Sequence, residues 1–155
     1  MSLSFKMKLG WCVLVGCTVL LTGCPSIAPY NLRSYELTTA AKAEALEVVS
    51  QAVEPYGDHV NDIESLRLTV EKAYEFANGI PRNDEAVSMW MEIKGWVYDS
   101  ETQRWRAIDN GNLYPTLALW QRNGPLSAYA VEEKKKQIAR SFDQLIELES
   151  GKNKN

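Results

Sequence analysis

The side chains able to carry catalysis or hold a metal are few, and their spacing does not gather them. His59 is the only histidine, and Asp62 lies three positions later, where a helix would place it on the same face. A metal site needs three or more convergent ligands, and one imidazole among scattered carboxylates is a loose set. Neighbouring glutamates such as Glu132 and Glu133 are typical of solvated helix faces. We therefore expect no metal, no cofactor other than a covalent lipid, and no catalytic residues.

Aromatic side chains are concentrated in the middle third of the sequence. Their flat rings could stack on a sugar or a peptide, which makes the cluster the best candidate for a partner or ligand surface. The simpler interpretation is that the same rings pack short segments onto a helical core. The candidate surface consists of Trp90, Trp96, Tyr98, Trp105, Tyr114 and Trp120.

A basic run at residues 134–136 is followed by Arg140. Glu132 precedes Lys136 by four positions, which is the favourable order for an ion pair on a helix. We expect a solvated helix face here, and contact with anionic lipid headgroups is the alternative.

The first 24 residues have the pattern of an export signal. Lys6 and Lys8 form a short positive region, and the 13 residues of segment 9–21 are almost wholly apolar. As a helix this segment would rise about 20 Å, which is short of the roughly 30 Å hydrocarbon core of a bilayer. It therefore predicts a signal peptide over residues 1–23 rather than a stable transmembrane helix.

The end of this segment, Leu21-Thr22-Gly23-Cys24, resembles the lipobox of bacterial lipoproteins. The resemblance implies that a diacylglycerol is attached to the thiol of Cys24 and that the chain is cut before it. Pro25 stands where an aspartate would resemble an inner-membrane retention signal. The resemblance therefore implies an outer-membrane lipoprotein facing the periplasm, or one on the outer face of the cytoplasmic membrane where no outer membrane exists. An ordinary cleaved signal or an uncleaved anchor is the alternative.

Cleavage would change the charge and the thiol content. Two of the 17 basic residues would be lost, which lowers the formal charge from −3 to −5. Cys12 and Cys17 would leave with the signal, and Cys24 would carry lipid, so no thiol would remain for a disulfide, a metal or a nucleophile. The acidic balance argues against a nucleic-acid partner, which would require a basic face.

The next segments predict a tether and a long helical region. Residues 24–33 contain two prolines and no helical period, so we expect a flexible, extended tether that lifts the domain about 30 Å from the lipid. Strong helix formers follow, with Ser34 as the candidate N-cap and Gly79 and Pro81 as the end signal.

An apolar seam with steps of three and four residues predicts that this region packs lengthwise against a partner helix. Pro55 either kinks one long helix or lies in a turn, residues 54–58, between two antiparallel helices. The seam keeps its phase across Pro55, which favours the kinked helix. The seam consists of Leu46, Val49, Val53, Tyr56, Val60, Ile63, Val70, Tyr74 and Ala77.

Shorter elements complete the chain. Short helices are expected at residues 85–94 and from Pro115, and residues 96–108 form either a small β-hairpin or an irregular loop. Ser127 is the candidate cap of a final helix over residues 128–149, and residues 151–155 are expected to fray. The apolar positions of this helix, the partner for the first seam, are Val131, Ile138, Phe142, Leu145 and Leu148.

The sequence thus predicts an all-α domain over residues 34–150. We expect a non-catalytic adaptor or accessory protein of the cell envelope that is held on the membrane and has a protein partner. Small helical lipoproteins such as the pilotins that escort secretin subunits resemble this chain in size, anchor and helix content, which is an analogy only. The first alternative is a module that binds cell-wall glycan or peptide through the aromatic cluster, and the second is a small envelope enzyme.

Overall fold

The computed structural model describes residues 27–107 and 112–152, without the side chains of Val97, Tyr98 and Trp105. The predicted signal peptide, Cys24 and residues 153–155 lie outside the described residues. Within the described part the fold is mostly α-helical, as the sequence predicts, with one two-stranded ribbon. No helix among these residues has the length and apolar character needed to cross a bilayer.

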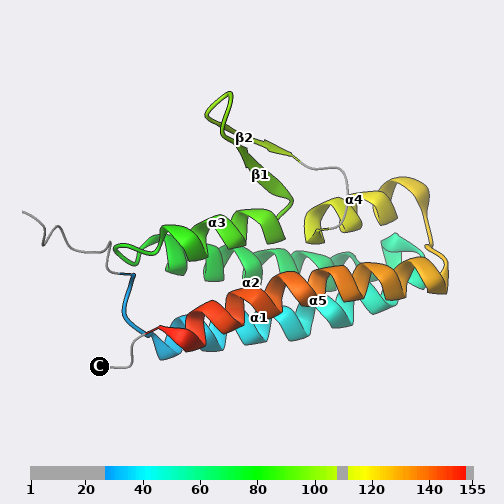
Figure 1. Cartoon of the computed structure of the whole chain (residues 1–155). Coiled ribbons are helices and arrows are strands. Elements are labelled where there is room, and N and C mark those ends of the chain that lie inside the picture. Colours follow the sequence, from blue (N-terminus) through cyan, green and yellow to red (C-terminus); the bar gives the residue numbers. More distant parts are fainter. Residues whose placement is uncertain (1–26, 108–111, 153–155) are drawn as a thin grey trace, which may run out of the picture.

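The helices form an up-and-down bundle with four columns (Figure 1). Helices α1 (Leu32–Ser50) and α2 (Val60–Asn78) are antiparallel neighbours, and α5 (Ala128–Gly151) runs antiparallel to α1 along its length. Helices α3 (Asp84–Ile93) and α4 (Leu113–Asn123) lie end to end as the fourth column. The ribbon, β1 (Trp96–Asp99) and β2 (Arg104–Ala107), interrupts this column and projects away from the bundle.

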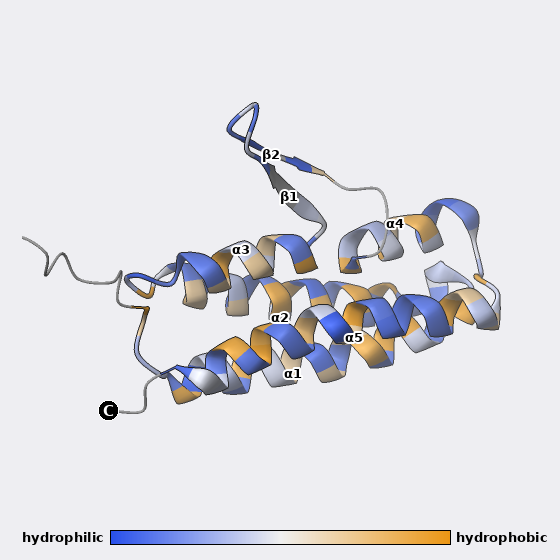
Figure 2. Ribbon diagram, viewed as in Figure 1, coloured by the Kyte–Doolittle hydropathy of each residue, from blue (hydrophilic) through white to orange (hydrophobic). Residues whose placement is uncertain are grey.

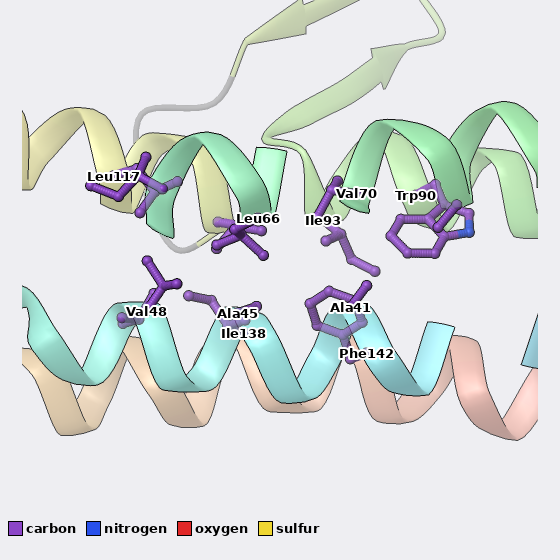
Figure 3. Packing of buried hydrophobic residues seen from close by; sticks show 14 of the residues in the cluster. Ala41, Ala45, Val48, Leu66, Val70, Trp90, Ile93, Leu117, Ile138 and Phe142 are labelled. Carbon is purple, nitrogen blue, oxygen red and sulfur yellow. The ribbon is translucent and has the colours of Figure 1, made fainter. Parts of the chain in front are cut away.

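The core fills the space between the four columns. Hydrophobic and hydrophilic patches alternate along the helices in Figure 2, as expected for helices with one buried side. In Figure 3, Ala41 and Ala45 of α1 lie close to the larger side chains of the facing helices. Trp90 of α3 meets Phe142 of α5 edge to face, with ring centroids 5.8 Å apart. Each of the four columns contributes buried side chains to this single core.

The apolar pattern of α5 is confirmed, and the seam of the first region is confirmed in part. Val131, Ile138, Phe142 and Leu145 are buried, and Leu148 packs partly buried against the core. The buried members of the first seam are Val49, Ile63, Val70 and Ala77, whereas Val53 and Val60 are exposed.

The favoured interpretation of Pro55 is wrong, and the turn is right. Helix α1 ends at Ser50, and two 3₁₀ turns, η1 (Gln51–Val53) and η2 (Tyr56–His59), flank Pro55, whose backbone is extended. Continuity of the seam across Pro55 did not reflect a continuous helix. The chain reverses here, and α2 returns along α1 (Figure 1).

A side chain from the fourth column stabilises this turn. The indole Nε1 of Trp120 donates a hydrogen bond of 2.8 Å to the carbonyl oxygen of Glu54. The ring of Tyr56 meets Trp120 edge on at 5.2 Å, and the ring of His59 lies 5.6 Å away. The reversal therefore depends on a residue 66 positions later in the chain.

The first helix begins inside the segment predicted as tether. Its cap is Asn31, whose side chain accepts hydrogen bonds from the backbone N–H groups of Arg33 and Ser34, so the prediction of Ser34 as cap is wrong. Ser34 is buried within the helix. Ala28 is also buried, and its N–H donates to the carbonyl oxygen of Arg82 at 3.0 Å. Residues 28–33 therefore belong to the bundle.

The last helix extends to Gly151, beyond the predicted end. Its predicted cap is confirmed, because the Ser127 hydroxyl oxygen accepts from the N–H of Ala130 at 3.2 Å. Lys152, which the sequence places in the frayed tail, is buried and donates to Glu149 at 2.7 Å and to Asn83 at 2.6 Å. The structure therefore corrects the tail prediction at Gly151 and Lys152.

Candidate functional site

The described surface is hollowed between α3 and α5 and, separately, between α1 and α2. The first hollow, of about 470 Å³, includes Met89 and Leu148 in its lining. The second, of about 190 Å³, lies beside Glu44, Glu47 and Asp62. Among the described residues, no group of three or more histidine, cysteine or carboxylate side chains is placed to hold a metal ion.

His59 belongs to the turn at Pro55. Its Nε2 lies 2.7 Å from Oε2 of Glu54, and its Nδ1 lies 3.8 Å from Oδ2 of Asp62. The predicted shared face of His59 and Asp62 is therefore present. Both carboxylates are more than half exposed, and the imidazole lies against Trp120. This arrangement supports the turn.

The predicted aromatic surface does not form as a single patch. Trp90 and Trp120 are 1% and 0% exposed, so both pack in the core, as the simpler interpretation predicts, and neither belongs to the candidate surface. Tyr114 is half-buried at the start of α4, and its hydroxyl is occupied by Glu71. Trp96 is 39% exposed on β1. The side chains of Tyr98 and Trp105 are outside the description, but their backbones are paired in the ribbon.

Of the two alternatives for residues 96–108, the structure shows the β-hairpin. Its register sorts its residues onto two faces. Trp96 pairs with Ala107, and Tyr98 pairs with Trp105. Because directly paired residues share a face, and so do residues two apart in a strand, the three aromatic positions fall on one face. The opposite face has Val97, Asp99, Arg104 and Arg106 as its positions.

The turn of the ribbon is specified by its own residues. The carboxylate of Asp99 accepts hydrogen bonds from the N–H groups of Glu101 at 2.9 Å and Thr102 at 3.2 Å. These backbone bonds, first that of Thr102, hold the pKa of Asp99 below its ordinary value. Gln103 closes the turn with a φ of 53° in the left-handed region. The turn of the ribbon is therefore defined by contacts within the ribbon itself.

The base of the ribbon is fixed by a close backbone approach. Gly95, which joins α3 to β1, has a φ of 94°, and a Cβ at this position would lie 2.4 Å from Cδ of Pro115. Only glycine fits here, because the conformation is left-handed and the space is already filled. Nearby, the side-chain amide of Asn112 donates to the carbonyl oxygen of Glu92. The end of α3 and Gly95 are thus held against the start of α4.

One carboxylate connects three helices below this base. Glu71 of α2 accepts a hydrogen bond from the Tyr114 hydroxyl at 2.7 Å and another from the Lys94 ammonium at 2.7 Å. The ammonium also lies 4.0 Å from the ring centroid of Tyr74, and the guanidinium of Arg67 lies 5.0 Å from that of Tyr114. Burial and the bond to Glu71 raise the pKa of Tyr114. We call Glu71, Lys94 and Tyr114 the basal clamp.

Sequence reasoning missed the basal clamp. No pattern near Glu71 in the sequence marks it, because both of its partners are distant along the chain. Lys94 lies 23 positions away and Tyr114 lies 43 positions away. The available signal was the lysine before Gly95, at the junction between a predicted helix and a predicted strand.

The basic run of α5 lies on a solvated face, as expected, but with different partners. Lys135 pairs with Glu132 at 2.9 Å, and Lys136 pairs with Glu133 at 2.8 Å. Both pairs are three residues apart, so the expected pair of Glu132 with Lys136 is replaced. The Glu133–Lys136 pair lowers the pKa of Glu133 and raises that of Lys136.

No family model, curated protein or solved structure matches the chain. The class is therefore defined by the structure itself, as a four-column helical bundle with a β-ribbon inserted in its fourth column. The ribbon with its basal clamp is the candidate functional site.

Proposed function

We propose that the protein is a lipid-anchored accessory protein of the cell envelope, a non-catalytic adaptor that presents the β1–β2 ribbon to a protein partner. The observation that supports it best is the position of the ribbon, which projects from the bundle while its base is fixed (Figure 1). In the part of the chain that the structure describes, neither outer edge of the ribbon pairs with another strand.

A ribbon that projects from the bundle contributes little to the stability of the fold, which supports the proposed role. A lone two-stranded hairpin is marginally stable in water, and a projecting one gains little from the core. This fold nevertheless defines its turn through Asp99 and its base through Gly95 and the basal clamp. Open strand edges accept an additional strand from a partner. The ribbon therefore has the geometry of a presented binding element.

The residue types of the ribbon agree with this role. Tryptophan, tyrosine and arginine are the residues that most often dominate the energy of protein interfaces. The ribbon carries Trp96, Tyr98 and Trp105 at positions of one face, and the exposed Arg104 and Arg106 at positions of the other. The adaptor role thus assigns a use to the aromatic and arginine residues of the ribbon.

The membrane anchor in this proposal is supported by the sequence alone. The apolar segment and the lipobox ending at Cys24 supply it. Its test is the intact mass of the protein purified from membranes, where we expect cleavage before Cys24 and a diacylglycerol on its thiol. A free thiol at Cys24 would contradict the anchor.

The adaptor role is tested by affinity capture from detergent-solubilised native membranes after mild crosslinking. We expect one protein to be recovered in stoichiometric amount with the wild type. A variant with residues 97–106 replaced by a short Gly-Ser turn should lose it. The matched control is the double variant Lys135→Ala and Lys136→Ala on the solvated face of α5, which should retain it. Equal recovery with the ribbon variant, or none with the wild type, would refute the role.

A cell-wall glycan or peptide is the second candidate ligand, and the aromatic positions on one face of the ribbon favour it. Because Trp90 and Trp120 are buried, a fluorescence change on binding should come from the ribbon. Titration with wall fragments should give a saturable shift that weakens in Trp96→Phe. A constant spectrum up to millimolar ligand would count against this candidate.

A further inference from the structure

The chain is fixed to the bundle very soon after the proposed lipid site. Ala28 is fully buried and is hydrogen-bonded to Arg82 in the α2–α3 loop, and Asn31 caps α1. Only the short segment from Cys24 to Ala28 separates the proposed lipid site from the bundle. Four residues span at most about 14 Å when fully extended, less than half of the tether length that the sequence suggested.

The loop that receives Ala28 is itself pinned. Asn83, in the same loop, accepts a hydrogen bond from the buried Lys152 at 2.6 Å and donates one to the carbonyl oxygen of Ala77 at 2.9 Å. The start of α1, the α2–α3 loop and the end of α5 therefore form one end of the bundle (Figure 1). We call residues 27–33, 79–83 and 149–152 the proximal end.

The proximal end also exposes apolar side chains. Ile27 is 43% exposed and Leu32 is 58% exposed, and both lie within eight positions of Cys24. The middle of the long sides carries exposed carboxylates such as Glu47 and Glu64. A side laid on a bilayer would bring these carboxylates close to lipid phosphates, which repel them.

We propose that the proximal end rests on the headgroup region of the bilayer, so that the bundle stands end-on with the Pro55 turn directed away from the membrane. This inference rests on the proposed lipid at Cys24. The short connection keeps the proximal end near the surface, and Ile27 and Leu32 contact the headgroup region. Helix α1 has 19 residues, so the Pro55 turn lies about 28 Å further out.

Lipidated full-length protein in phosphatidylethanolamine and phosphatidylglycerol vesicles tests this stance. A fluorophore is placed on Asn78→Cys near the proximal end or on Asp58→Cys at the Pro55 turn, two exposed polar positions. Quenching by spin-labelled headgroups should be several-fold stronger at position 78 than at position 58. Equal quenching at both positions would overturn the end-on stance.

Two matched comparisons isolate the cause. Insertion of ten Gly-Ser residues between Ser26 and Ile27 should lower the quenching at position 78, because the connection no longer restricts the bundle. Leu32→Ser should lower it as well, whereas Leu68→Ser, on the side of α2 and similarly exposed, should not. Unchanged quenching in both the insertion and the Leu32 variant would refute the proposal.

Failure of the anchor can be distinguished from failure of the stance. The mass of each labelled sample reports whether Cys24 carries lipid before any quenching is measured. An unlipidated chain that stays in solution refutes the proposed anchor. A lipidated, vesicle-bound chain with equal quenching refutes only the end-on orientation.

Discussion

The ammonium of Lys152 donates a hydrogen bond to the side-chain oxygen of Asn83 at 2.6 Å, across 69 positions of sequence. The same ammonium pairs with Glu149 at 2.7 Å, and the two charged side chains are 1% and 0% exposed. Asn83 in turn donates to Ala77. This buried network connects the end of α5 to the α2–α3 loop, and through that loop to the docked Ala28.

Lys152→Met should destabilise the fold strongly. It leaves the carboxylate of Glu149 buried without its counter-charge, and removing one partner of a buried ion pair costs about 3–5 kcal/mol. Urea unfolding followed by circular dichroism measures the loss. Lys135→Met, which breaks a partly exposed pair, is the control and should cost about 1 kcal/mol or less.

The double variant Glu149→Leu and Lys152→Met separates charge from packing. Replacing both partners with apolar residues removes the unpaired charge, so most of the lost stability should return. If Lys152→Met proves as mild as Lys135→Met, the pair is solvated and the proximal end is looser than the structure shows.

The sequence predicted features that depend on residues close together along the chain, and it missed features that depend on residues far apart. The apolar face of α5 and the Ser127 cap depend on neighbours a few positions apart, and the sequence predicted both. The hairpin also depends on near neighbours, and the sequence offered it as one of two alternatives. The turn at Pro55 depends on Trp120, and the burial of Lys152 depends on Asn83. No local pattern contains those partners, so the helix at Pro55 and the frayed tail were natural errors.

The aromatic cluster shows the same limit at the candidate site. Composition marked six aromatic residues but could not sort them, because burial is decided by the bundle as a whole. Trp90 and Trp120 fill the core, and the ribbon register groups three others on one face. Strand alternation could have predicted that face once the hairpin was accepted.

Gly95→Ala should destabilise the junction between α3 and the ribbon. The methyl group would lie 2.4 Å from the Pro115 ring. The positive φ would cost a further energy of about 1–2 kcal/mol for a residue with a Cβ. We expect a loss of more than about 2 kcal/mol in urea unfolding, combining this strain with the cost of overpacking. Gly57→Ala is the matched control, since its Cβ meets nothing within 4 Å. Similar stability of the two variants would contradict a tight junction.

The two buried tryptophans differ in one hydrogen bond, so substituting each of them measures what that bond contributes to stability. Trp120 donates to the carbonyl oxygen of Glu54, whereas the indole nitrogen of Trp90 has no hydrogen-bond partner. Both changes to phenylalanine remove similar volume, but only Trp120→Phe also removes a bond. It should therefore cost about 0.5–1.5 kcal/mol more than Trp90→Phe. Equal losses in thermal and urea unfolding would show that the Trp120 bond does not stabilise the Pro55 turn.

The basal clamp should make the protein sensitive to alkali through Tyr114. Burial and the bond to Glu71 raise the pKa of this phenol in the folded chain above its ordinary value near 10. Above that pH the unfolded chain loses the proton and the folded chain keeps it. The unfolded state then binds fewer protons, so stability must fall as pH rises. The stability of the wild type relative to Tyr114→Phe should therefore decrease steadily above pH 10 and stay constant between pH 7 and 9. Urea unfolding of both proteins at each pH measures it, and parallel profiles up to pH 11.5 would show that the hydroxyl is solvated and not held by Glu71.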